Sequence, residues 1–209
     1  MKHQQYNKQI QFVKEPVEFN KYTPRELLGY CLGGNLYMPS SKDMAEKIIQ
    51  KSIPGLTTMT MCFEDAIGEE DLAQAQDNVI DILNKLAHAL ETGEITRNDL
   101  PLYFLRVRNV KQFKSFTKRL THEHFQILTG FIFPKFTAEN GHAYLEHLDY
   151  LNKKEHEILY GMPILESPEI IYKETRMNEL VAIQSLLNAY RPYILNVRVG
   201  AQISLRNMD

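Results

Sequence analysis

The sequence predicts an α/β protein built on a parallel β-sheet with both faces covered by helices. Six short apolar runs alternate along the chain with segments in which apolar residues recur every three or four positions. These are the patterns of strands and amphipathic helices, and their alternation is typical of parallel sheets. No Gly-x-Gly-x-x-Gly or Walker motif follows the first strand, which disfavours a nucleotide-binding open sheet. The strand pattern by itself does not separate an open sheet from a closed barrel.

The N-terminal elements are predicted from turn and capping residues. Residues 1–22 are polar and aperiodic and predict an extended lead-in, which leaves 23–209 as a single domain. Thr23 as a cap, Pro24 at the first helical position and Glu26 predict the start of a short helix, which ends at Gly33-Gly34. After the first strand, Ser40 or Ser41 caps a second helix through about Gln50.

The remaining strands and helices continue to alternate along the chain. The expected strands are residues 36–39, 57–63, 102–107, 130–135, 160–166 and 193–199. The longest helix carries Leu72, Ala75, Val79, Ile82, Leu83, Leu86 and Leu90 and closes at Thr92-Gly93. The later helices are 110–120, one that carries Ala143, Leu145, Leu148 and Leu151, and one that carries Met177, Leu180, Val181, Gln184 and Leu187.

The net charge, the apolar runs and the cysteines limit the functions that the chain is expected to have. A formal charge of −2 gives no electrostatic case for nucleic acid as a partner. No apolar run approaches the length of a membrane helix or resembles a signal peptide, so we expect no membrane partner and a cytoplasmic location. Cys31 and Cys62 stand in apolar surroundings and are expected to be buried free thiols.

Polar residues recur where the predicted strands end. Strand 57–63 is followed by two carboxylates and the later strands end near basic or acidic residues, namely Glu64, Asp65, Arg106, Arg108, Lys135, Glu166, Arg198 and Gly200. Any one of them alone is typical of a solvated loop or a helix cap. Because the carboxyl ends of parallel strands open onto one face, five strands in succession predict a mixed-charge site. Carboxylates there suit Mg²⁺, which takes oxygen ligands.

Other catalytic chemistries find little support. His122, His124, His142, His147 and His156 lack metal-ligand spacing and are interpreted as surface residues. No Gly-x-Ser-x-Gly elbow or reactive-cysteine pattern occurs, so the sequence does not favour covalent hydrolysis.

Five segments carry a resemblance to a known superfamily. They are Leu36-Tyr37-Met38-Pro39, Cys62-Phe63-Glu64-Asp65-Ala66-Ile67, Phe104-Leu105-Arg106-Val107-Arg108, Gly130-Phe131-Ile132-Phe133-Pro134-Lys135 and Met162-Pro163-Ile164-Leu165-Glu166-Ser167. In order and spacing they resemble the HpcH/HpaI aldolase and citrate lyase β-subunit superfamily. The nearest branch is the bacterial TIM-barrel carbon–carbon bond lyases associated with tellurium-resistance gene clusters. The resemblance spans roughly residues 30 to 201.

The resemblance implies a (β/α)8 TIM barrel with its active site at the carboxyl ends of the strands. Arg106 matches the superfamily's arginine that binds a substrate carboxylate, and Glu166 matches its first metal-binding glutamate. Glu64 and Asp65 match its acidic pair near the metal and its waters. Lys135 matches a recurrent Pro-Lys whose role stays open. The implied cofactor is Mg²⁺, or another divalent cation such as Mn²⁺. The implied reaction is aldol- or Claisen-type cleavage or condensation of a carboxylate-bearing keto-acid or an acyl substrate, including acyl thioesters.

The sequence also departs from the superfamily pattern. Its sixth strand usually continues Gly-x-x-Asp, and that aspartate is the second metal ligand. Here Ile203 stands at that place, and Asp209 is the only later carboxylate. We expect a barrel truncated after the sixth strand, hence a fragment, a frame-disrupted version or a chain completed by a partner. We also expect a homo-oligomer. The alternative function is a catalytically impaired barrel that acts as an assembly or interaction subunit.

Overall fold

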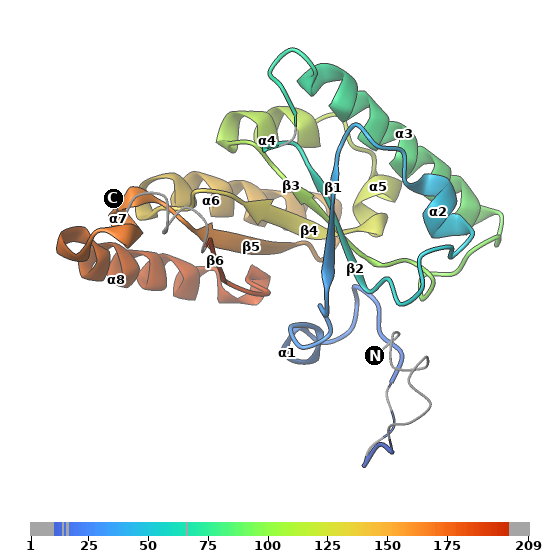
Figure 1. The fold of residues 1–209 in the computed structure, drawn as a ribbon, viewed down its shortest axis with the longest axis horizontal. Helices are drawn as coiled ribbons and strands as arrows, with labels where there is room; N and C mark the ends of the chain where they lie inside the picture. Colours follow the sequence, from blue (N-terminus) through green and yellow to red (C-terminus); the bar gives the residue numbers. More distant parts are fainter. Residues whose placement is uncertain (1–10, 14, 16, 66, 201–209) are drawn as a thin grey trace. The chain divides into compact units, whose positions relative to one another are not determined.

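The computed structural model describes residues 11–13, 15, 17–65 and 67–200. Its internal contacts divide the chain into two compact units, and each is described by itself. Unit 1 runs to Leu105 and includes Leu120–Thr129, and unit 2 consists of Arg106–Arg119 and the residues from Gly130 onward. Figure 1 labels the helices and strands of both units. Among the described residues, no helix combines the length and apolarity needed to cross a membrane.

The six strands form a sheet in which they follow one another in chain order. They are β1 (Asn35–Pro39), β2 (Thr58–Cys62), β3 (Leu102–Arg106), β4 (Leu128–Phe133), β5 (Tyr160–Leu165) and β6 (Arg198–Val199). The pairs β1–β2, β4–β5 and β5–β6 are parallel. Because helices connect these parallel strands, the predicted α/β class is confirmed.

In unit 1 the helices are α1 (Arg25–Leu28), α2 (Ala45–Ile49), α3 (Leu72–Glu91) and α5 (His122–Ile127). The apolar spacing that predicted the longest helix is confirmed in α3, which buries Ala75, Val79, Ile82, Leu83, Leu86 and Ala89. This face of α3 packs against α2 and α5. Strand β2 is buried along its whole length, as expected for a strand covered on both faces.

In unit 2 the helices are α4 (Val110–Thr117), α6 (Ala138–Glu155), α7 (Pro168–Ile171) and α8 (Lys173–Ala189), with a 3₁₀ turn at Arg191–Tyr193. Its core is aromatic: Phe113 packs against Phe131 and Phe133 with ring centroids 4.7 and 5.4 Å apart, and Tyr144 stacks on Phe133 at 4.6 Å. Helix α6 lies against both α4 and α8. These contacts fix the carboxyl ends of β4 and β5 within the unit.

Several predicted caps are wrong because the polar side chains bind elsewhere. The Thr23 hydroxyl accepts the Asn20 N–H and forms no capping box, and α1 ends at Leu28, before Gly33. The Ser40 hydroxyl donates to the carbonyl of Cys62, and the Asp43 carboxylate, which accepts the Ala45 N–H, stands before α2 instead.

Other element boundaries also differ from the prediction. The predicted helix 110–120 ends at Thr117, and α5 follows as a separate helix. The predicted strand 193–199 is reduced to two residues with an isolated bridge at Ile194, since a 3₁₀ turn occupies its start. In α8, Met177 and Val181 are exposed although their spacing contributed to predicting the helix.

The described part of the predicted lead-in is anchored in unit 1. Phe19 and Lys21 are buried, and the Lys21 ammonium donates to the carbonyl of Phe125, near the C-terminus of α5. A cation at that end of a helix is favoured by the helix dipole. Residues 1–10 lie outside the described residues.

Candidate active site

Two predicted site residues meet in unit 2. Arg106 is the last residue of β3, and Glu166 follows β5 directly. The Arg106 Nη2 lies 3.5 Å from the Glu166 Oε1, and the two side chains are only 11% and 6% exposed. An ion pair so withdrawn from water is screened much less than a surface pair. The structure therefore brings these two strand-end residues together, and their roles in an active site stay predictions.

Lys135 joins the same carboxylate through its backbone. It follows β4 and the buried Pro134, and its N–H donates to the Glu166 Oε1 over 3.0 Å. Lys135 has a φ of +48°, in the left-handed region that residues with a Cβ rarely adopt. This backbone conformation directs the N–H at Glu166, and the side chain is exposed.

Gly200 lies against the other oxygen of the same carboxylate. Its N–H donates to the carbonyl of Leu165, which continues the pairing of β5 with β6. A Cβ built at Gly200 would come within 2.6 Å of both the Cβ and the Oε2 of Glu166. Only glycine leaves room for Glu166 in this position. Ile203, which stands where the superfamily pattern has its second metal-binding aspartate, and Asp209 lie outside the described residues.

Glu64 and Asp65 belong to unit 1. They follow β2 directly, where Glu64 is half-buried with its N–H 3.4 Å from the Cys62 Sγ, and Asp65 is exposed. Their place beside a metal stays a prediction. Arg108, in unit 2, donates its backbone N–H to the Gln112 Oε1 and is half-buried.

The described residues contain no cluster of three or more His, Cys, Asp or Glu side chains that could hold a metal ion. Among the described residues of unit 2, the carboxylate that the structure brings to this site is that of Glu166. A Mg²⁺ ion typically takes one or two protein carboxylates and completes its shell with water and substrate oxygens. The buried carboxylate of Glu166 is therefore compatible in chemistry with one protein ligand of such an ion.

A protein family described as C-C bond lyases of the TIM-barrel fold has a model that matches residues 26–207. The chain belongs to this family. The match contains all of the predicted site residues, Glu64, Asp65, Arg106, Lys135 and Glu166. No curated protein matches the chain. The predicted TIM-barrel fold type and the lyase class are thus confirmed at the level of the family.

The histidines of this lyase-family chain do not all lie at the surface. His122, His142 and His156 are exposed as predicted, but His124 is buried, so its surface assignment is wrong. His124 closes a capping box with Thr121 at the start of α5. Its Nε2 lies 2.8 Å from the Asn84 Oδ1. The spacing Thr121-x-x-His124 resembles a capping box and is the signal that was missed.

His147 is also partly buried, in unit 2. Its Nε2 lies 2.8 Å from the Thr117 hydroxyl, and its ring meets that of Phe113 edge-on, with centroids 4.8 Å apart. Burial lowers the pKa of His147 to about 4, helped by the positive charges of Lys114 and Lys118. The ring is therefore neutral at physiological pH and belongs to the packing between α4 and α6.

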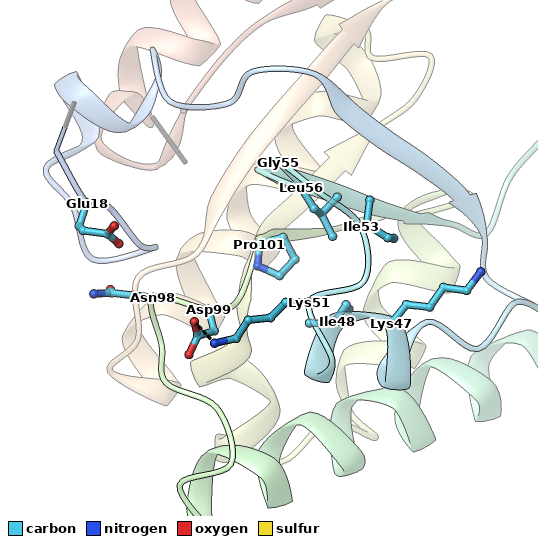
Figure 2. A pocket seen from close by; sticks show the side chains of 10 residues that line it. All are labelled: Glu18, Lys47, Ile48, Lys51, Ile53, Gly55, Leu56, Asn98, Asp99 and Pro101. Atoms are coloured by element: carbon cyan, nitrogen blue, oxygen red, sulfur yellow. Dashed lines mark ion pairs between the residues drawn. The ribbon is translucent and has the colours of Figure 1, made fainter. Parts of the chain in front are cut away.

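Unit 1 contains a cavity of about 180 Å³. Figure 2 shows the side chains that line it. Its lining includes Gly55 and Leu56 before β2 and Pro101 before β3, so it lies at the amino ends of these strands. Lys51 crosses it to pair with Asp99 at 2.7 Å. Burial raises the pKa of Asp99, but hydrogen bonds from Lys51 and Thr96 outweigh this and lower it to about 2.

This cavity is not the candidate active site. Parallel βα folds bind substrates at the carboxyl ends of the strands, whereas the amino ends serve stability. Lys51 and Asp99 instead tie the end of α2 to the loop before β3.

Proposed function

We propose that this chain is a Mg²⁺-dependent carbon–carbon bond lyase of the HpcH/HpaI and citrate lyase β-subunit type. Its substrate would be a carboxylate-bearing keto-acid or acyl compound, cleaved or formed by aldol or Claisen chemistry. The observation that carries the proposal is the buried pair of Arg106 and Glu166 at the ends of β3 and β5. Family membership independently supports the lyase class.

Arg106 would bind the substrate carboxylate. A guanidinium presents five N–H donors in a planar fork that matches the two oxygens of a carboxylate. Arg106 stays charged at any physiological pH, and its burial strengthens the attraction for an incoming anion. Holding the carboxylate at two points fixes the orientation of the bond to be cleaved, which lowers the entropic part of the barrier.

Glu166 would hold the cation. The Lys135 N–H donates to its Oε1, and Gly200, which has no side chain, lies next to its Oε2. For Glu64 and Asp65, a role near the cation and its waters stays what the superfamily resemblance implies. When bound, Mg²⁺ would supply the positive charge that offsets negative charge developing on the substrate oxygen as the carbon–carbon bond breaks.

Calorimetric titration with Mn²⁺ and Mg²⁺ tests the metal assignment. Glu166→Gln removes the anionic ligand and keeps the size of the side chain, so we expect at least about a tenfold loss of affinity. Glu169→Gln is the matched control, because Glu169 is exposed three residues further on. Equal affinity in the wild type and Glu166→Gln would exclude Glu166 as a ligand.

Lyase assays on panels of keto-acids and acyl thioesters test the role of Arg106. Arg106→Lys keeps the charge but loses the planar fork, so we expect a raised KM together with a lower kcat. Arg191→Lys, at an exposed position, should leave both unchanged. A panel with no turnover by the wild type would contradict the proposed reaction.

A further inference from the structure

The backbone of Lys135 is held from both sides. Its N–H donates to the Glu166 Oε1 over 3.0 Å, and its carbonyl accepts the Asn140 Nδ2 over 2.9 Å. These two bonds act on the peptides before and after the residue, so together they restrain both of its backbone dihedrals. This restraint matters because the φ of +48° is unfavourable for lysine and persists only where the surroundings enforce it.

Asn140 is itself firmly placed. It is the third residue of α6, where its Oδ1 accepts the Thr137 N–H over 3.0 Å and its own N–H donates to the Thr137 hydroxyl over 3.1 Å. The side-chain oxygen of Asn140 thus serves the helix cap, and its side-chain nitrogen donates to Lys135. Phe136 lies between Lys135 and Asn140 in the chain and is buried. Its N–H donates to the carbonyl of Ile164, and this bond also holds the segment from Lys135 to Asn140 in place.

We infer that Asn140 is a positioning residue for Glu166, acting through the left-handed backbone of Lys135. The helix cap of α6 holds Asn140, Asn140 holds the carbonyl of Lys135, and the N–H of Lys135 fixes the Oε1 of Glu166. The second oxygen of the carboxylate is thereby presented in one orientation. The consequence for cation binding rests on the proposed function, whereas the orientation of the carboxylate does not.

Asn140→Asp isolates the hydrogen bond to Lys135. The aspartate keeps the size and the oxygen that accepts the Thr137 N–H, but it has no N–H₂ to donate to the carbonyl of Lys135. Its negative charge near a cation site would by itself tighten Mn²⁺ binding. Loss of positioning predicts the opposite, a loss of affinity of about 10- to 100-fold, as found for residues that orient metal ligands.

Rescue by glycine distinguishes positioning from a general structural role. Glycine adopts a positive φ without steric cost, so Lys135→Gly in the Asn140→Asp background should restore Mn²⁺ affinity to within about threefold of the wild type. Lys135→Ala in the same background also lacks the ammonium but keeps a Cβ, and should not restore it. Asn178→Asp, at an exposed position in α8, is the control for added charge.

Hydrogen exchange of the residue 135 amide in metal-free protein provides the second measurement. Asn140→Asp should speed this exchange at least about tenfold while leaving the thermal unfolding temperature and the amides of β5 unchanged. If the wild type binds no Mn²⁺, the proposed function fails and the exchange result alone decides the positioning role. Exchange at residue 135 and Mn²⁺ affinity that both stay at wild-type values in Asn140→Asp would overturn the inference.

Discussion

Removing both members of the Arg106–Glu166 pair should cost less stability than the sum of the two single removals. The two charges lie 3.5 Å apart with side chains 11% and 6% exposed. At an effective dielectric constant of about 20, their attraction is about 5 kcal/mol. Arg106→Met or Glu166→Gln would leave the other charge buried without this partner, so each should lower the free energy of unfolding by about 3–5 kcal/mol.

The double variant Arg106→Met/Glu166→Gln carries neither charge. We expect it to recover at least about 2 kcal/mol relative to the sum of the single effects, because no uncompensated charge is left. Urea unfolding at neutral pH, followed by far-UV circular dichroism because the chain has no tryptophan, gives the four free energies. Single effects that add to within about 0.5 kcal/mol would refute the reasoning that the two charges stabilise each other.

Three further predictions concern the stability of unit 2. The pKa of His147 is about 4 against its usual 6.5, so the unfolded chain binds the proton first as the pH falls. Stability should therefore drop by about 1–2 kcal/mol between pH 6.5 and 4, allowing for partial exposure, and His147→Gln should remove this slope in urea titrations. Gly130→Ala would place a Cβ 1.9 Å from the carbonyl oxygen of Tyr160, and an expected loss of about 3 kcal/mol or more would show as a lower urea midpoint. A loss below about 1 kcal/mol would mean that the two strands separate easily. Asn152→Ala would remove the buried amide that binds the N–H and the carbonyl of Leu159, and calorimetry should show a lower unfolding temperature, from a loss of about 2–3 kcal/mol; an unchanged temperature would contradict it.

Much of the fold follows from local sequence patterns. Strands β2 to β5 were predicted within two residues at each end because their runs are buried on both faces and carry a continuous apolar signal. The bounds of strand β6 and the boundary between α4 and α5 were not predicted, because they depend on tertiary contacts. The 3₁₀ turn at Arg191–Tyr193 replaces a segment whose apolar residues resemble a strand.

The candidate site was predictable in part. Arg106 and Glu166 follow from the rule that strand ends gather catalytic groups, and the structure brings them together. The backbone role of Lys135 was not predictable, because a positive φ in a lysine has no signature in its own residue type. Asn140 was missed, because the spacing Thr137-x-x-Asn140 before a helical segment resembles a capping box and indicates only where a helix begins.

The contact between Gly200 and Glu166 has a consequence for directed evolution. The φ of Gly200 is not in the left-handed region, so the backbone conformation does not itself demand glycine, and the demand is for space. Every other amino acid carries a Cβ and would meet the same collision with Glu166 at 2.6 Å. A library randomised at the codon for Gly200 should therefore return glycine almost exclusively when clones are selected for an unchanged position of the Glu166 carboxylate. Even alanine, the smallest replacement, should be rejected.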